Sequence, residues 1–468
     1  MGSLRRTGLF LLIFFCSLNM TACLSSNPVK SAKNIETSLV SRENNELVKL
    51  QYAQWSIPLT LSVENALQKY NEENTDGIQV ELLKIPRASY SETLNMLLSS
   101  GEGPDVFEAR SEWLFSYIYK NWLYDFKSSI EDDFFDNFPE WVRDYALNPK
   151  FKGFFYSVPS GQVTYRLIYN KDLFRRSGLD PLKPPSTIDE MVLDAKKITE
   201  AGKGDRKYGF ALAMNDVWSG LVYPMEAVNS YSGIYYFDFK SGKYNFTNYA
   251  PWLNAMKTMK EDGSLFPGET VMKEDLALVQ FAEGNIGMMY AENWQPVLLK
   301  ELFPVNCEWA VAMPPVTDIN SKDRGFVSIT PTGWQAVNRK TKYLDKALTF
   351  WKYLYSQEYN EGMFKSGSFI PTFKGITDNR ELFPVIKNWD EFLPSKAETV
   401  YPGTPLDIDE CNRSNLYLSI FNGSVPTESA LSAESDRLNL QFDKFIYNHS
   451  IDLGDFINPD FTPSNNTK

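Results

Sequence analysis

The order of predicted elements near the start of the chain constrains its fold most. Residues 47–52 and 78–85 are predicted strands, and a third strand follows at 104–107. Between them, apolar residues recur at helical spacing over 63–70 and 90–99. A β-α-β-α-β order favours a parallel sheet with helices on its faces, because each helix returns the chain to the same end of the sheet.

The same alternation of strands and helices resumes further along the chain. Further strands are predicted at 162–169, 208–213 and 286–290. A helix opens at Thr187, which has the spacing of a capping box with Glu190. Runs of Pro and Gly interrupt the pattern near 158–161, 313–325 and 367–375. We expect the chain to cross there between two α/β lobes.

Charge and residue usage exclude several classes of function. The chain has 468 residues, and 47 Lys and Arg against 59 Asp and Glu give a net charge of −12. An acidic chain repels phosphate, so no nucleic-acid partner is expected. The one histidine, His449, excludes a histidine-rich zinc site and disfavours a Ser-His-Asp enzyme. We expect a monomer with no catalytic residues, no cofactor and no metal site.

The first 46 residues are predicted to lie outside the folded body. Residues 1–22 form a signal peptide, whose apolar stretch at 8–18 is too short to span a bilayer. The segment MTAC at 20–23 resembles the bacterial lipoprotein signal, in which the chain is cut before the cysteine and the thiol of Cys23 carries a lipid. The alternative is an ordinary signal peptide with a chance cysteine. Residues 23–46 are polar and are expected to be a flexible tether.

Cys307 and Cys411 are the cysteines that follow this segment. A disulfide is permitted outside the cell, and two free thiols are equally compatible with the sequence.

Five segments, in order along the chain, carry a resemblance to a known family. They are SSGEGPDV at 99–106, GFFYSVP at 153–159, IYNKDLF at 168–174, PSTIDE at 185–190 and FAEGNIGM at 281–288. Each is weak alone, but their order and spacing together resemble the extracellular solute-binding proteins of ABC importers, the maltose-binding-protein-like class. A lipoprotein signal upstream agrees with this resemblance independently.

The resemblance implies an α/β fold of two lobes joined by hinge strands, with a ligand cleft between them that closes on the ligand. The first lobe would comprise 47–160 and 320–372, and the second 161–319 and 373–468. The protein would be anchored by its lipid to the outer face of the cell membrane and deliver its ligand to permease subunits. The sequence does not match the maltose-binding pattern of acidic residues that contact the sugar, so maltodextrin is not implied.

Candidate ligand-binding residues follow the predicted strands. Sugars present hydroxyl groups and weakly apolar C–H faces, so their sites combine stacking aromatic rings with planar polar side chains. The candidates are Trp55, Glu108, Arg110, Trp113, Gln162, Asn215, Trp218, Glu292, Asn293, Trp294, Trp334 and Tyr401. Each tryptophan has a competing interpretation as a core residue. Trp294, which follows a strand and two polar residues, is expected to face the cleft.

Other functions remain compatible with the sequence. A glycoside hydrolase would need two carboxylates at a defined separation, and acidic residues are plentiful, but none stands in a recognisable motif. A surface adhesin or scaffold would need no deep cleft. The same fold could also bind a peptide, a polyamine or a phosphorylated compound. The number of tryptophans favours carbohydrate over these ligands, and we expect an oligosaccharide.

The lipid anchor gives the first test. Because lipidation requires the cysteine thiol, Cys23→Ser should release the protein from the membrane or leave the signal uncut. Metabolic labelling with a fatty acid and membrane fractionation in a bacterial host would measure this. Unchanged labelling of the variant would contradict the prediction.

Overall fold

The structure is a computed structural model that describes residues 47–56, 60–147, 154–321, 326–395, 398–400 and 410–461. The predicted signal peptide, Cys23, the tether and Tyr401 lie outside the described residues, as does the side chain of Cys411. Cys307 is a free, half-buried cysteine. Within these ranges, no helix combines the length and the apolar character needed to cross a membrane.

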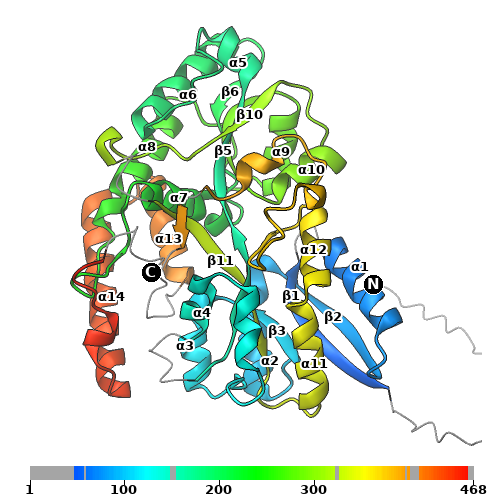
Figure 1. The fold of residues 1–468 in the computed structure, drawn as a ribbon. Helices are drawn as coiled ribbons and strands as arrows, with labels where there is room; N and C mark the ends of the chain where they lie inside the picture. The colour runs from blue at the N-terminus through cyan, green and yellow to red at the C-terminus, as the bar shows by residue number, and fades with distance from the viewer. Residues whose placement is uncertain are drawn as a thin grey trace, which may run out of the picture. The chain divides into compact units, whose positions relative to one another are not determined.

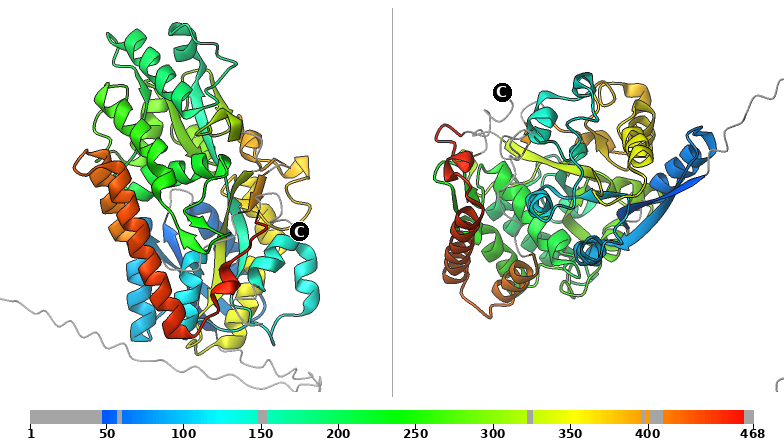
Figure 2. Two further views of the ribbon diagram at one scale, coloured as in Figure 1. Left: turned by 90° about the vertical axis from the view of Figure 1, so that its left-hand side faces the viewer. Right: turned by 90° about the horizontal axis from the view of Figure 1, so that it is seen from below.

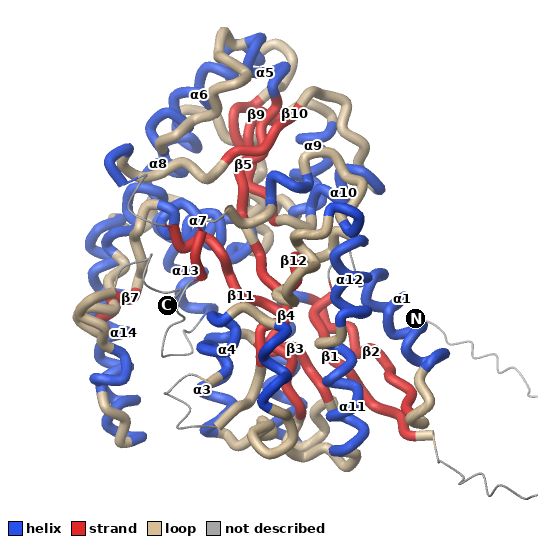
Figure 3. The backbone as a smooth tube through the Cα atoms, in the orientation of Figure 1, coloured by secondary structure: helices blue, strands red, loops and turns tan. Residues whose placement is uncertain are grey.

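The larger of two mixed sheets has the strand order β12-β4-β11-β3-β1-β2, with β13 paired to β11 (Figures 1 and 3). Its strands are β1 Val48–Ser56, β2 Ile78–Pro86, β3 Val106–Ala109, β4 Val158–Val163, β11 Phe326–Val337, β12 Ile370–Pro371 and β13 Glu398–Val400. β1 runs parallel to both β2 and β3. Helices α1 (Thr60–Glu73) and α2 (Tyr90–Ser100) connect these strands, which confirms the predicted β-α-β-α-β order.

The smaller sheet has the order β10-β5-β9-β6. Its strands are β5 Tyr165–Asn170, β6 Tyr208–Phe210, β9 Ile286–Glu292 and β10 Trp309–Ala312, and a separate hairpin pairs β7 Phe237–Asp238 with β8 Lys243–Tyr244. β6 is shorter than the predicted strand at 208–213, and β9 extends the predicted strand at 286–290 by two residues.

Helices cover both faces of each sheet (Figure 1). The remaining α-helices are α3 Ser111–Tyr119, α4 Glu140–Ala146, α5 Lys171–Arg176, α6 Ile188–Gly202, α7 Tyr223–Tyr231, α8 Ala250–Glu261, α9 Glu274–Ala282, α10 Gln295–Glu301, α11 Leu344–Leu354, α12 Gln357–Lys365, α13 Glu410–Phe421 and α14 Thr427–His449. Short 3-10 or π turns are η1 Arg87–Ser89, η2 Asp132–Asn137, η4 Trp218–Val222, η5 Thr247–Tyr249, η6 Ile319–Ser321, η7 Arg380–Leu382, η8 Trp389–Phe392 and η9 Leu453–Phe456. The capping box predicted for Thr187 and Glu190 is present at the start of α6.

The strands carry apolar side chains on both faces because both faces are covered. On β1, Tyr52 packs with α1 and α11, whereas the next residue, Ala53, packs with α2 and α3. On β5, Leu167 and Ile168 divide in the same way between two clusters of the smaller sheet. Successive side chains of a strand point to opposite faces of the sheet. Because both faces are buried, the sequences of these strands are nearly continuous apolar runs.

The chain passes between the sheets at Thr164. β4 ends at Val163 and β5 begins at Tyr165, so the prediction of one continuous strand over 162–169 was wrong. The N–H of Thr164 donates to Oδ1 of Asn293 at 3.2 Å, and its carbonyl accepts the backbone N–H of Asn293 at 3.2 Å. These bonds replace the ladder bonds of a strand, so the fully buried Thr164 belongs to neither sheet.

The C-terminal helices belong to the part of the protein built on the smaller sheet. α14 packs against α8 and the β7–β8 hairpin (Figure 2). Its Asn439 accepts the N–H of Tyr244 at 2.8 Å, and its Ser435 accepts the N–H of Phe246 at 2.9 Å.

A buried ion pair ties β5 of the smaller sheet to β13 of the larger sheet. Nη2 of Arg166 lies 2.9 Å from Oε1 of Glu398, and the two side chains are 1% and 0% exposed. The guanidinium group also donates to the carbonyls of Tyr165, Glu391 and Leu393. Such a pair is tolerable in the interior because its hydrogen bonds compensate the loss of water.

Removing one partner of this pair should strongly destabilise the fold. Arg166→Met removes the cation that neutralises the buried Glu398 carboxylate. The variant should lower the free energy of unfolding by about 3–5 kcal/mol. Urea unfolding measures the change, with Arg176→Met as the control because Arg176 pairs with Asp205 at the exposed surface. An equal loss in both variants would contradict the argument.

Candidate functional site

Side chains from the two sheets meet around Tyr223, the first residue of α7. Nη2 of Arg110, which follows β3, donates a hydrogen bond to the Tyr223 hydroxyl. The Cζ atom of Arg110 lies 5.6 Å from the Tyr223 ring centroid, and Cζ of Arg87, just after β2, lies 5.5 Å from it. The rings of Tyr165 and Trp218 lie 5.8 and 5.9 Å away. We call these five residues, together with Glu292, the junction cluster.

Glu292 is the acidic member of the junction cluster. Nη1 and Nη2 of Arg87 lie 3.5 and 3.4 Å from its Oε1 atom. Its Oε2 atom accepts the indole N–H of Trp294 at 2.8 Å. Its backbone N–H donates to Oε1 of Gln295 at 3.0 Å, and the Gln295 amide in turn donates to Glu274 at the start of α9. One carboxylate is thus held by an arginine from the larger sheet and an indole from the smaller one.

Aromatic contacts extend the junction cluster along the larger sheet. Trp55, near the end of β1, meets the ring of Tyr90 edge-on at 5.3 Å. Tyr90 stacks on Trp113 at 6.1 Å, and Cζ of Arg110 lies 5.6 Å from the Trp113 ring. A continuous row of rings and one guanidinium group therefore joins Trp55 to Tyr223.

Two carboxyl groups here have strongly raised pKa values. The pKa of Glu274 is raised to about 8, first by burial and then by the charge of Glu292, whereas the charge of Arg87 acts in the opposite direction. Burial also raises the pKa of Glu108, on β3, to about 7, although hydrogen bonds from Gln54 and Gly333 act in the opposite direction. Near neutral pH, the site therefore carries fewer negative charges than its count of acidic residues indicates.

The structure places the predicted residues in three environments. Arg110, Trp218 and Glu292 belong to the junction cluster, which Trp55 and Trp113 join through the row of rings. Trp113, Trp294 and Trp334 are 3%, 4% and 2% exposed, so most of each ring lies in a core.

The predicted amide side chains lie elsewhere. Asn293 accepts the backbone N–H of Thr164, and Gln162 donates to the carbonyl of Pro371 at 3.4 Å within the larger sheet. Asn215 is exposed. Trp55 and Trp218 are half-buried and retain ring surface for a ligand.

Sequence reasoning missed Arg87, Tyr165, Tyr223 and Glu274. Arg87 directly follows β2, so the rule that site residues follow strands could have found it. Tyr223 and Glu274 begin helices, and Tyr165 begins a strand, so a search confined to strand ends does not reach them.

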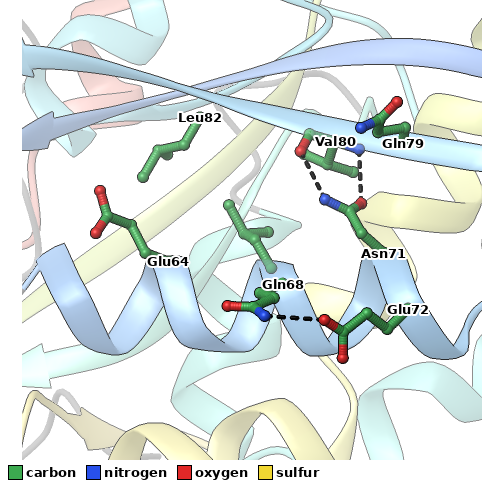
Figure 4. Close-up of a pocket in the computed structure, with 8 residues that line it drawn as sticks. Glu64, Gln68, Asn71, Glu72, Gln79, Val80 and Leu82 are labelled. Atoms are coloured by element: carbon green, nitrogen blue, oxygen red, sulfur yellow. Dashed lines mark hydrogen bonds between the residues drawn. The ribbon is translucent and has the colours of Figure 1, made fainter.

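A separate pocket of about 470 Å³ lies on the surface between α1 and β2 (Figure 4). Its lining comprises Glu64, Leu67, Gln68, Asn71, Glu72, Gln79, Val80 and Leu82, and none of these is a predicted ligand-binding residue. The Asn71 amide donates to the carbonyl of Val80 at 2.9 Å and accepts its N–H at 2.7 Å. Asn74 bonds both backbone groups of Ile78 in the same way.

The chain belongs to the bacterial extracellular solute-binding protein family, whose profile matches residues 58–361. A protein of Brucella abortus (strain 2308) named as a binding protein is 23% identical over 378 residues, which cover 76% of this chain and 88% of the relative. The maltose-bound MalE3 structure from T. maritima has a TM-score of 0.68 at 20% identity and covers 84% of this chain and 99% of its own. An ABC substrate-binding protein from Listeria monocytogenes in complex with cycloalternan has a TM-score of 0.65 at 19% identity, with 84% and 99% covered.

These comparisons confirm the family and the α/β fold of maltose-binding-protein-like proteins that the motifs predicted. The chain is the extracellular solute-binding component of an ABC importer, and the family implies a permease as its partner. The expectation that it is not an enzyme is also confirmed, because members of this family bind solutes without transforming them.

The raised pKa of Glu274 predicts a pH dependence of stability. The unfolded chain releases this proton near pH 4.5, whereas the folded protein keeps it until about pH 8. Stability from this group is therefore complete below pH 4.5 and is lost as the pH rises toward 8. Glu274→Gln cannot ionise, so its free energy of unfolding should rise relative to that of the wild type between pH 5 and pH 8.

Urea unfolding at several pH values measures this difference. Glu200→Gln is the control, because Glu200 is exposed on α6 and its variant should follow the wild-type curve. Parallel curves for wild type and Glu274→Gln would contradict the prediction.

Proposed function

We propose that this protein is a lipid-anchored binding protein that captures a carbohydrate of oligosaccharide size between two lobes and delivers it to a membrane permease. The observation that carries the proposal is the junction cluster, where half-buried Trp218 lies beside Tyr223, Arg110 and Glu292. Aromatic faces suit sugar C–H groups, and planar charged groups suit pairs of hydroxyls. Maltose and cycloalternan in the related structures support this class of ligand.

We assign one of the proposed lobes to each sheet. Residues 47–160 and 320–372 supply most of the larger sheet, and 161–319 supply the smaller one. Of the segment 373–468, α13 and α14 pack with the smaller sheet, whereas β13 pairs with β11 of the larger sheet. The hinge is then expected near Thr164 and near the crossings predicted at 313–325 and 367–375.

The charges of the junction cluster favour a sugar over a polyamine. A polyamine needs ionised carboxylates, but the pKa values of Glu108 and Glu274 are raised to about 7 and about 8, and Glu292 already contacts Arg87. Two arginines near the same ring would also repel a cationic ligand. A neutral, hydroxyl-rich ligand needs no ionised carboxylate and is not repelled by the two arginines.

Trp218 provides the test of sugar stacking. A thermal-shift screen of oligosaccharides first identifies a ligand, since a ligand at 100 times its Kd adds about 2.7 kcal/mol of stability. Loss of a stacked ring costs about 1–3 kcal/mol, so Trp218→Ala should weaken binding by about 5- to 150-fold in calorimetry.

Trp334→Ala is the matched control. Trp334 is 2% exposed, and its variant should lose about 3–5 kcal/mol of unfolding free energy while the folded fraction keeps near-normal affinity. A screen in which no sugar raises the melting temperature, while a peptide or polyamine does, would overturn the proposed ligand class.

A further inference from the structure

The junction cluster joins the two parts of the protein, which are also linked by the chain at Thr164 and by the Arg166–Glu398 pair. Arg87 and Arg110 follow β2 and β3 of the larger sheet. Tyr223 begins α7, whose Met225 and Val228 lie in the core of the smaller sheet, and Glu292 ends β9 of that sheet. Contacts among these side chains therefore depend on how the two parts are oriented.

Each arginine makes a polar contact and an aromatic contact across this boundary. Arg87 pairs with Glu292 at 3.4 Å and lies 5.5 Å from the Tyr223 ring. Arg110 donates to the Tyr223 hydroxyl and lies 5.6 Å from the same ring. Tyr223 is thus contacted by both guanidinium groups, which come from successive strand ends of the larger sheet.

The charged and aromatic neighbours of Arg87 come from the part of the protein built on the smaller sheet. Glu292, Tyr223, Glu274 and Tyr165 all act on its charge, and all four lie on elements of the smaller-sheet part. The Arg87 side chain is 26% exposed and that of Glu292 is 6% exposed, so solvent screens the pair only in part. Opening a hinge between the parts would separate Arg87 from each of these groups.

We propose that Arg87 and Arg110 clasp Tyr223 and Glu292, and that this clasp biases the hinge toward its closed arrangement independently of any ligand. Every contact in the clasp is between groups of the chain itself, so a solute is not required to make it. The clasp concerns how the proposed site closes, and it does not depend on which solute the site binds. It would raise the affinity for any ligand that requires closure and leaves these contacts in place.

The identity of the residue matters, because arginine can serve both contacts at once. A planar guanidinium group can lie near a ring while its edge donates to a carboxylate, whereas a lysine ammonium is a compact point charge. Arg87→Lys should therefore retain part of the clasp, and Arg87→Met should lose it.

Distance measurements on the full-length chain without added solute test the clasp directly. Spin-labelled noncanonical residues at Met96 on α2 and Leu193 on α6 report the separation of the two parts, because α2 packs on the larger sheet and α6 on the smaller one. Both positions tolerate a label because they are 63% and 57% exposed. In Arg87→Met, the ratio of short to long distances should fall about five- to tenfold, with a larger fall in the double variant Arg87→Met/Arg110→Met.

Arg437→Met is the matched control. Arg437 pairs with Glu434 within α14, so its variant should keep the wild-type distances. Circular dichroism confirms that each variant is folded before distances are compared. An unchanged distance distribution in the folded double variant would overturn the clasp. Because no ligand is added, this result is separate from the outcome of the sugar screen.

Discussion

The structure depends on how charged groups are satisfied where the two sheets approach one another. A charge taken out of water must find an opposite charge or several hydrogen bonds, and at this boundary the partners come from different sheets. Arg166 of β5 meets Glu398 of β13, and Arg87 after β2 meets Glu292 of β9. The first pair is fully buried and surrounded by carbonyl groups, so it acts as a fixed attachment. The second is partly exposed, so it can be broken at lower cost.

This difference would suit the hinge motion that we propose, because the protein would move and yet remain folded. Thr164, Asn293 and the Arg166–Glu398 pair lie at the passage between the sheets, where the proposed motion would alter distances least. Arg87, Arg110 and Tyr223 lie at the strand and helix ends, where the same change alters distances more. The raised pKa of Glu274 complements this arrangement, because a protonated carboxyl group can lie near Glu292 without repulsion.

Much of the fold could be predicted because its causes are local. Alternation and helical spacing predicted β1, β2, β3 and the helices between them, and the pair Thr187 and Glu190 predicted a helix start. The break at Thr164 could not be predicted, because Asn293, which satisfies its backbone, lies 129 residues away. The residues of the site could be predicted only in part, for the same reason. Strand ends indicated Arg110 and Glu292, but the role of Tyr223 depends on a helix start brought close by tertiary packing.

Two asparagines, Asn71 on α1 and Asn74 directly after the helix, have a consequence for the free edge of the larger sheet. β2 ends the strand order, so the backbone groups on its outer side could pair with a strand of another molecule. Asn71 and Asn74 bond the N–H and carbonyl of Val80 and Ile78, as an added strand would. A side-chain amide presents an N–H donor and a carbonyl acceptor side by side in one plane, which copies a peptide group but cannot be extended into a ladder. The two asparagines thus protect the sheet against edge-to-edge aggregation over the first half of β2.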